Sequence, residues 1–176
     1  MKPFIGIKQI WYGEIFDEAV TATSLKAWIA SATEVKNSHQ DTWSYTQDDP
    51  SVTDYINELT GTPYYRDMTS AGNKTIAFTM GVYEFSDRVA LQGGKLVMDG
   101  DDVIGWEAPT NPEMIYKGIV AKTKTGNYIV FTNAGIVAKT NAAEKNLGLG
   151  VTAVAMDNTG SEIPNEYLFD GEAVDK

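Results

Sequence analysis

The stretch that decides the fold runs from residue 41 to residue 91. It reads Asp41-Thr-Trp-Ser-Tyr-Thr-Gln-Asp-Asp-Pro50-Ser-Val-Thr-Asp-Tyr-Ile-Asn-Glu-Leu59 and, after a polar segment, Lys74-Thr-Ile-Ala-Phe-Thr-Met-Gly-Val-Tyr-Glu-Phe85. Alternation of polar and apolar residues with a period of two is typical of a β-strand with one wet face. Ser86 then starts a short helix that ends at Gly93-Gly94. The stretch predicts strands and edges of sheet, and it matches no active site.

The strands in this stretch differ in how far they can be buried. One side of the segment from residue 74 to residue 82 is wholly apolar, which predicts a core strand that buries Ile76, Phe78, Met80 and Val82. In the segment from residue 52 to residue 59 neither side is cleanly apolar. That pattern predicts an exposed or protruding strand, set off from the strand before it by Asp48-Asp-Pro-Ser51.

The rest of the chain is also rich in strand patterns. Apolar residues at Leu25, Trp28, Ile29 and Ala32 predict one short helix, with Thr23 as its N-cap. Strands are predicted over residues 4–12, 114–122, 128–132, 135–138 and 147–156. Regular strand spacing without an internal repeat or linker predicts one domain over residues 1–176. Its fold class is mainly β, an antiparallel β-sandwich or barrel with one or two short flanking α-helices.

Composition narrows the function. The 176 residues carry 14 basic and 24 acidic side chains, a formal net charge of −10. Such a surface lacks the cations that hold nucleic-acid phosphates, so DNA should pass without tight binding. The absence of cysteine excludes disulfides and thiolate chemistry. Lys8 and Gln9 interrupt the apolar core that a signal peptide needs, and no apolar run reaches about 20 residues, so no membrane association is expected.

The residues that could carry chemistry fit ordinary structural roles better. His39 is the only histidine, and it lies too near Ser38 and Asp41 in sequence to form a relay with them. Asp99-Gly-Asp-Asp102 fails the calcium-loop pattern because Val103 and Ile104 follow it. Carboxylate pairs such as Asp48-Asp49 are expected by chance in an acidic chain. We therefore expect no enzyme activity, no cofactor and no metal.

Five segments, taken in order, resemble the phage major tail tube protein family. Asp41–Tyr55 resembles the acidic start of a strand in that family, and Lys74–Tyr83 resembles its core strand. Ser86–Gly94 looks like the short helix ending in a glycine pair. Tyr128–Ala138 and Gly148–Met156 are similar to the closing strands. The likeness covers most of residues 1–170.

The resemblance implies a structural subunit that assembles into rings, hexameric in the family, which stack into the hollow tube through which phage DNA is ejected. Neighbouring subunits would pair at the edges of their sheets. The implied partners are copies of the chain itself, with tape-measure and baseplate proteins. The implied location is the tail of a virion or prophage particle assembled in the cytoplasm of the bacterial host. The inner tube of a contractile injection system is a related alternative.

Two groups of residues follow as site hypotheses. We place the acidic residues near the bore or the joint between rings: Asp48, Asp49, Asp54 and Glu58. The aromatic residues either pack under the sandwich or form a subunit interface: Trp43, Tyr45, Tyr55, Tyr64 and Tyr65. The alternative function is an aromatic-rich β-sandwich that binds a glycan or cell-surface partner. A hydrolase that uses paired carboxylates is the third functional hypothesis.

Overall fold

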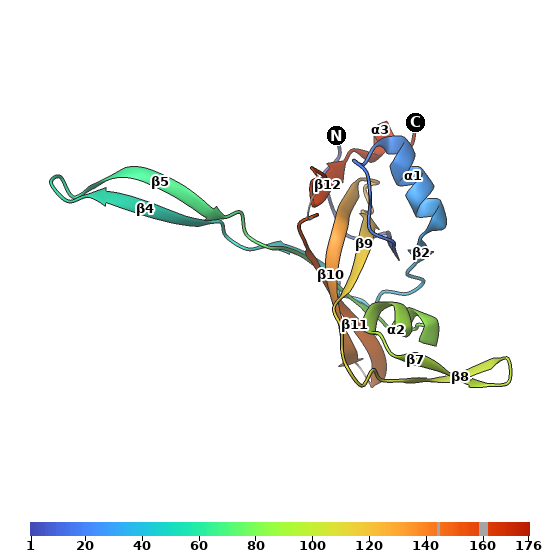
Figure 1. The fold of residues 1–176 in the computed structure, drawn as a ribbon. Helices are drawn as coiled ribbons and strands as arrows, with labels where there is room; N and C mark the ends of the chain where they lie inside the picture. Colours follow the sequence, from blue (N-terminus) through green and yellow to red (C-terminus); the bar gives the residue numbers. More distant parts are fainter. Residues whose placement is uncertain (144, 159–161) are drawn as a thin grey trace.

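The computed structural model describes residues 1–143, 145–158 and 162–176 (Figure 1). The described chain forms antiparallel sheets with three short helices, which confirms the predicted fold class. In chain order the elements are β1 (Gln9–Gly13), α1 (Ala22–Ser31), β2 (Thr33–Glu34), β3 (Ser44–Gln47), β4 (Ser51–Asn57), β5 (Thr62–Ser70), β6 (Lys74–Met80), α2 (Phe85–Gln92), β7 (Lys95–Asp99), β8 (Asp102–Glu107), β9 (Ile115–Lys122), β10 (Tyr128–Ala143), β11 (Asn146–Ala155), β12 (Glu166–Phe169) and α3 (Gly171–Val174).

The main sheet has the strand order β2-β1-β9-β10-β11-β6-β3, with β12 paired to the first part of β10. β10 is 16 residues long and carries a register shift between Phe131 and Ala134. A bulge of this kind bends a strand and increases its twist. The sequence predicted separate strands at 128–132 and 135–138; they are one strand, because the bulge between them interrupts only the register.

The sheet curls around one main core. Side chains from β1 and β9 share this core with side chains from β6 and β11, at the other end of the strand order. Tyr45 of β3 also meets Phe131 of β10, with ring centroids 6.3 Å apart. The curl gives two layers, one formed by β1, β9 and the first part of β10, the other by the rest of β10 with β11, β6 and β3. Ile76, Phe78 and Met80 are buried here as predicted. Val82 is 71% exposed, because the strand ends at Met80.

A second core covers the outside of the first layer. Leu25 of α1 and Val174 of α3 pack there against Trp11, Val120 and Val130. α1 begins two residues earlier than predicted: its N-cap is Thr21, whose hydroxyl accepts a hydrogen bond from the Ser24 backbone N–H at 3.1 Å. Thr23 lies inside the helix.

Two hairpins project from this body in Figure 1, β4–β5 to the left and β7–β8 to the right. Every residue of β4 and β5 is exposed except Asn57, which is half-buried. The protruding strand predicted at residues 52–59 is confirmed. Its partner β5 was missed because the segment between Leu59 and Lys74 was interpreted only as a polar connection. We call the β4–β5 hairpin the arm.

Candidate assembly interface: an open four-stranded layer and its arm

The outside of the second layer has no helical cover in the part of the chain that the structure describes. Side chains that alternate with the core-facing ones point outward here, and we call this surface the open face: Ser44, Thr46, Thr75, Ala77, Val137, Lys139, Thr152 and Val154. Val137 is 55% exposed, and Ser44, Thr46, Lys139 and Thr152 are exposed as well. The open face is small and rich in hydroxyls, and its single charge is that of Lys139.

This layer ends in a free edge on each side. Among the described strands, β3 pairs with β6 alone. At the other end, β9 pairs with β10 only as far as Ile136, so no described strand lies along that side of residues 137–142. A free strand edge presents unpaired N–H and C=O groups and is a template for another strand.

The direction of the backbone groups at both edges follows from the ladder. The Asp48 N–H donates to the Asn73 carbonyl at 2.9 Å, continuing the β3–β6 ladder. Along an antiparallel strand, the backbone N–H and C=O groups of successive residues point alternately to one neighbouring strand and to the other. The backbone groups of Tyr45 and Gln47 therefore point away from β6, to the free edge. On β10 the Met156 N–H donates to the Asn133 carbonyl at 2.8 Å, so the backbone groups of Asn133 point to β11. By the same alternation, the backbone N–H and C=O groups of Ala138 and Thr140 point away from β11, to the free edge.

These two edges are complementary. The order β10, β11, β6, β3 is antiparallel at every step, so β3 and β10 run in opposite directions. The side chains of the outward-bonding residues at both edges, Tyr45 with Gln47 and Ala138 with Thr140, are on the core side of the sheet. The opposite strand directions and the shared side-chain orientation both follow from the even number of strands in the layer. The β3 edge of one copy can therefore join the β10 edge of another as an antiparallel ladder that keeps the open faces continuous.

The arm is a direct continuation of β3 and β6. At the junction, Gly72 has φ +80°, and a Cβ there would lie 2.0 Å from the carbonyl oxygen of Asp48. Only glycine fits this close approach of two backbones. The junction therefore sets the direction in which the arm leaves the sheet.

Both faces of the arm carry large apolar side chains. Val52 and Met68 pair across the strands near the base. Tyr55 and Tyr65 pair further out, with ring centroids 5.7 Å apart and a 45° tilt, so they form no flat platform for a sugar. Leu59 at the tip is 95% exposed. An exposed apolar surface of this kind marks an interaction site.

The acidic residues singled out from the sequence lie along the arm and its junction with the body but form no cluster. Asp48 and Asp49 lie at the junction, and Asp54 and Glu58 lie further along the arm. Arg66 donates to Asp54 through two nitrogens at 2.5 and 2.9 Å, and this hydrogen bonding lowers the pKa of Asp54. The placement of these carboxylates near a bore or a ring joint stays a prediction.

The predicted aromatic group is divided between the body and the arm. Trp43 and Tyr45 lie at the β3 edge and line a cavity of about 480 Å³ that also includes Phe4, Ile129 and Leu168. The Tyr45 hydroxyl donates to Glu166 at 2.6 Å, and burial with this hydrogen bond raises the pKa of Tyr45. Tyr64, like Tyr55 and Tyr65, lies on the arm and is 70% exposed.

Two ion pairs hold the ends of the chain to the sheet. Lys74 of β6 pairs with Glu166 of β12, and both side chains are largely buried. Lys122 pairs with Asp175 at 2.8 Å, and Tyr128 donates to the same carboxylate at 2.8 Å. Hydrogen bonds from these two residues lower the pKa of Asp175. These contacts hold β12 and the C-terminal residues in place, and none of them involves a residue of the open face.

The β10 edge was missed in the sequence, although a signal for the open face was present. Residues 148–153 alternate small or hydroxyl side chains with Leu149, Val151 and Ala153. That alternation marks a strand with an uncovered face. Which strand lies at an edge depends on the order of strands, and no local pattern records that order.

Other kinds of site find little support among the described residues. No group of three or more His, Asp or Glu side chains there is placed to hold a metal ion. No helix in the same residues is long and apolar enough to cross a membrane. A comparison of the sequence with known protein families and with curated proteins finds no match.

Proposed function

We propose that this protein is a structural subunit of a phage-type tail tube, in which copies join head to tail through the four-stranded layer into rings, and the rings stack. The observation that carries the proposal is the pair of complementary free edges on a layer with an even number of strands. A heterologous contact of this kind closes into a ring when the rotation per subunit allows it. The resemblance in sequence to tail tube proteins points to six copies per ring.

The open face would line the bore. It lies on the side of the sandwich away from α1 and α3, and hydroxyl, methyl and glycine groups make up most of it. With Lys139 as its one cation per copy, the wall would give DNA phosphates few partners, so the polyanion could pass without being held. The carboxylates of the arm would then lie at the rims of the ring.

The exposed arm also supports the proposed assembly of copies. No other part of the described chain covers the side chains on either of its faces, so a neighbour on each face would bury them. Burial of this apolar area would offset the repulsion between copies that each carry a charge of −10. Because the arm projects away from the body (Figure 1), neighbouring copies are the partners that it would contact in a ring or stack.

A proline at the free edge tests the proposal. Gln47→Pro removes an N–H that points away from β6, so the β3–β6 ladder is kept while a joining strand loses a hydrogen bond. Gln47→Ala is the matched control, because it loses the same side-chain hydrogen bond to the Ala71 carbonyl. We expect rings or tubes by electron microscopy for the wild type and Gln47→Ala, and folded monomers for Gln47→Pro.

The same experiment distinguishes the tube subunit from the alternative function, a binding module for a glycan or cell-surface partner. Rings from Gln47→Pro as abundant as those of the wild type would contradict pairing at this edge. A wild-type protein that stays monomeric at high concentration, even with tail initiator proteins present, and binds immobilised glycans would favour the binding module.

A further inference from the structure

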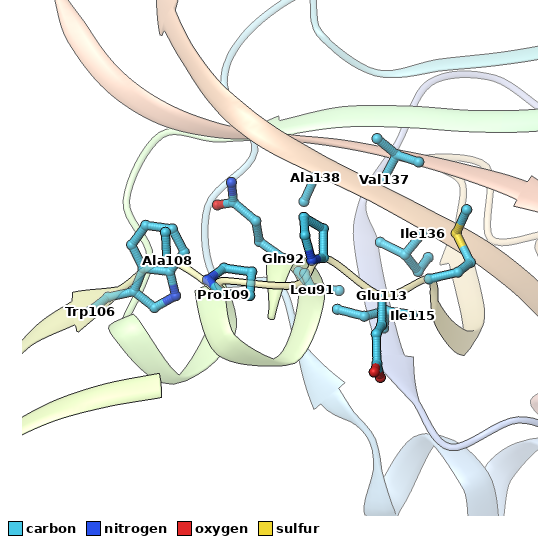
Figure 2. A pocket seen from close by; sticks show the side chains of 12 residues that line it. Leu91, Gln92, Trp106, Ala108, Pro109, Glu113, Ile115, Ile136, Val137 and Ala138 are labelled. Atoms are coloured by element: carbon cyan, nitrogen blue, oxygen red, sulfur yellow. The ribbon is translucent and has the colours of Figure 1, made fainter. Parts of the chain in front are cut away.

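An apolar groove lies beside the free edge of β10. It has a volume of about 460 Å³ and lies between α2, the connection from β8 to β9, and the middle of β10 (Figure 2). Its lining is mainly apolar and includes Leu91, Trp106, Pro109, Pro112 and Met114. The Trp106 indole N–H is already used, since it donates to the Gly93 carbonyl at 2.8 Å. The groove therefore offers mainly apolar contact, with the Gln92 amide and the Glu113 carboxylate as its polar side chains.

The groove begins where β9 leaves β10. Ile115, the first residue of β9, lies opposite Ile136, and the pairing of β9 with β10 does not extend past Ile136. Val137 and Ala138, the first residues of the free edge, also line the groove. A strand that joined the free edge from another copy would meet the groove at this end.

The start of β9 at Ile115 limits the registers open to the joining strand. With Gln47 opposite Ala138, Thr46 lies opposite Lys139, and Asp49 would fall opposite Ile136. The β9 strand already occupies that position, so the joining chain has to leave the sheet just after Gln47. The chain does leave there: β3 ends at Gln47, and β4 starts at Ser51 after Asp48-Asp49-Pro50. The arm of one copy would thus cross the groove of the next.

The base of the arm carries an apolar pair that suits this groove. Val52 and Met68 are cross-strand partners, 48% and 62% exposed. The next pair on the same face is charged, Asp54 with Arg66, so the apolar contact ends there. We propose that the groove binds the Val52–Met68 pair from the arm of the adjacent copy. This inference rests on the proposed function, and it names the contact that orients each arm.

Cysteine cross-linking tests the inference cleanly because the chain has no cysteine. Two double variants of the full chain are compared under mild oxidation in assembled particles. Thr46→Cys with Lys139→Cys reports pairing of the edges, and Val52→Cys with Met114→Cys reports the groove. We expect covalent ladders of oligomers from both variants, and none when Leu59→Cys at the arm tip is combined with Met114→Cys.

The outcomes separate the two proposals. Ladders from the Thr46 and Lys139 variant without ladders from the Val52 and Met114 variant would overturn the groove contact and leave the function standing. Assembled particles that give neither ladder would overturn both. As a second readout, Met68→Asp should raise the concentration needed for assembly about tenfold, whereas Leu59→Asp should change it less than about threefold. Equal effects of the two variants would overturn the groove contact.

Discussion

The two outer faces of this sandwich have opposite compositions. Outside the first layer, Trp11, Val120 and Val130 are buried under α1 and α3. Outside the second layer, Thr, Ser, Ala and Val alternate with core residues and no described helix or strand lies over them, although Thr79 near the end of β6 is buried beside Thr42 and Asn141. A face of large apolar residues must be covered to be stable, whereas a face of small hydroxyl residues tolerates water. The difference means that the second layer can stay in contact with water without a cover, which is what the proposed bore requires.

The largest expected effect comes from placing one charge on each face. Val120→Lys buries an ammonium group under α1, and we expect it to lower the free energy of unfolding by about 3–5 kcal/mol. Thr152→Lys places the same charge on the open face and should cost less than about 0.5 kcal/mol in the isolated subunit. Urea titration of both variants measures this. Similar losses for the two would show that the open face is covered.

A smaller effect should come from the junction of body and arm. Gly72→Ala forces a Cβ into contact with the Asp48 carbonyl, whereas Gly61→Ala, at φ +68° in the arm tip, meets no atom within 4 Å. Both substitutions carry the strain of a positive φ, about 1 kcal/mol, and Gly72→Ala adds the clash, for a total of about 2–3 kcal/mol. Thermal unfolding and assembly assays compare them. If Gly61→Ala impaired assembly as much as Gly72→Ala, the junction would not set the direction of the arm.

The smallest effect concerns the helix-covered layer. Hydrogen bonds from Lys122 and Tyr128 lower the pKa of Asp175 below its ordinary value of 3.8. At a pH above 3.8, the ionised Asp175 therefore stabilises the fold. This contribution is lost as the pH falls through the lower pKa of the folded state. Because Asp175 is half exposed, Asp175→Asn should cost less than about 1 kcal/mol. The protection factors of the amides of residues 171–176, which correct for the intrinsic pH dependence of exchange, should fall below about pH 4 in the wild type and show no such fall in the variant. Identical pH profiles would contradict the role of this carboxylate.

Much of the fold follows from local patterns in the sequence. The alternation at Ile76, Phe78 and Met80 predicts the core strand, and the lack of a clean apolar side at 52–59 predicts the arm. Such patterns work because one strand's two faces meet different surroundings. The start of α1 was harder to place, since Thr21, Thr23 and Ser24 can each cap a helix.

The candidate interface could be predicted only in part. Acidic and aromatic residues of the arm were found because their types are distinctive, but the free edges of Gln47 and Ala138 were not. Their role arises from strand order and from the bulge after Phe131, and both depend on contacts between residues far apart in sequence. The groove near Trp106 was missed for the same reason, because three separate elements build it.

Amide hydrogen exchange at β3 tests the completion of the four-stranded layer most directly. The N–H groups of Ser44 and Thr46 point to β6, and those of Tyr45 and Gln47 point outward. We expect the first two to be protected in the free subunit and in the particle, and the second two to gain protection only in the particle. Exchange at Tyr45 and Gln47 that is equally fast in both states would contradict the account.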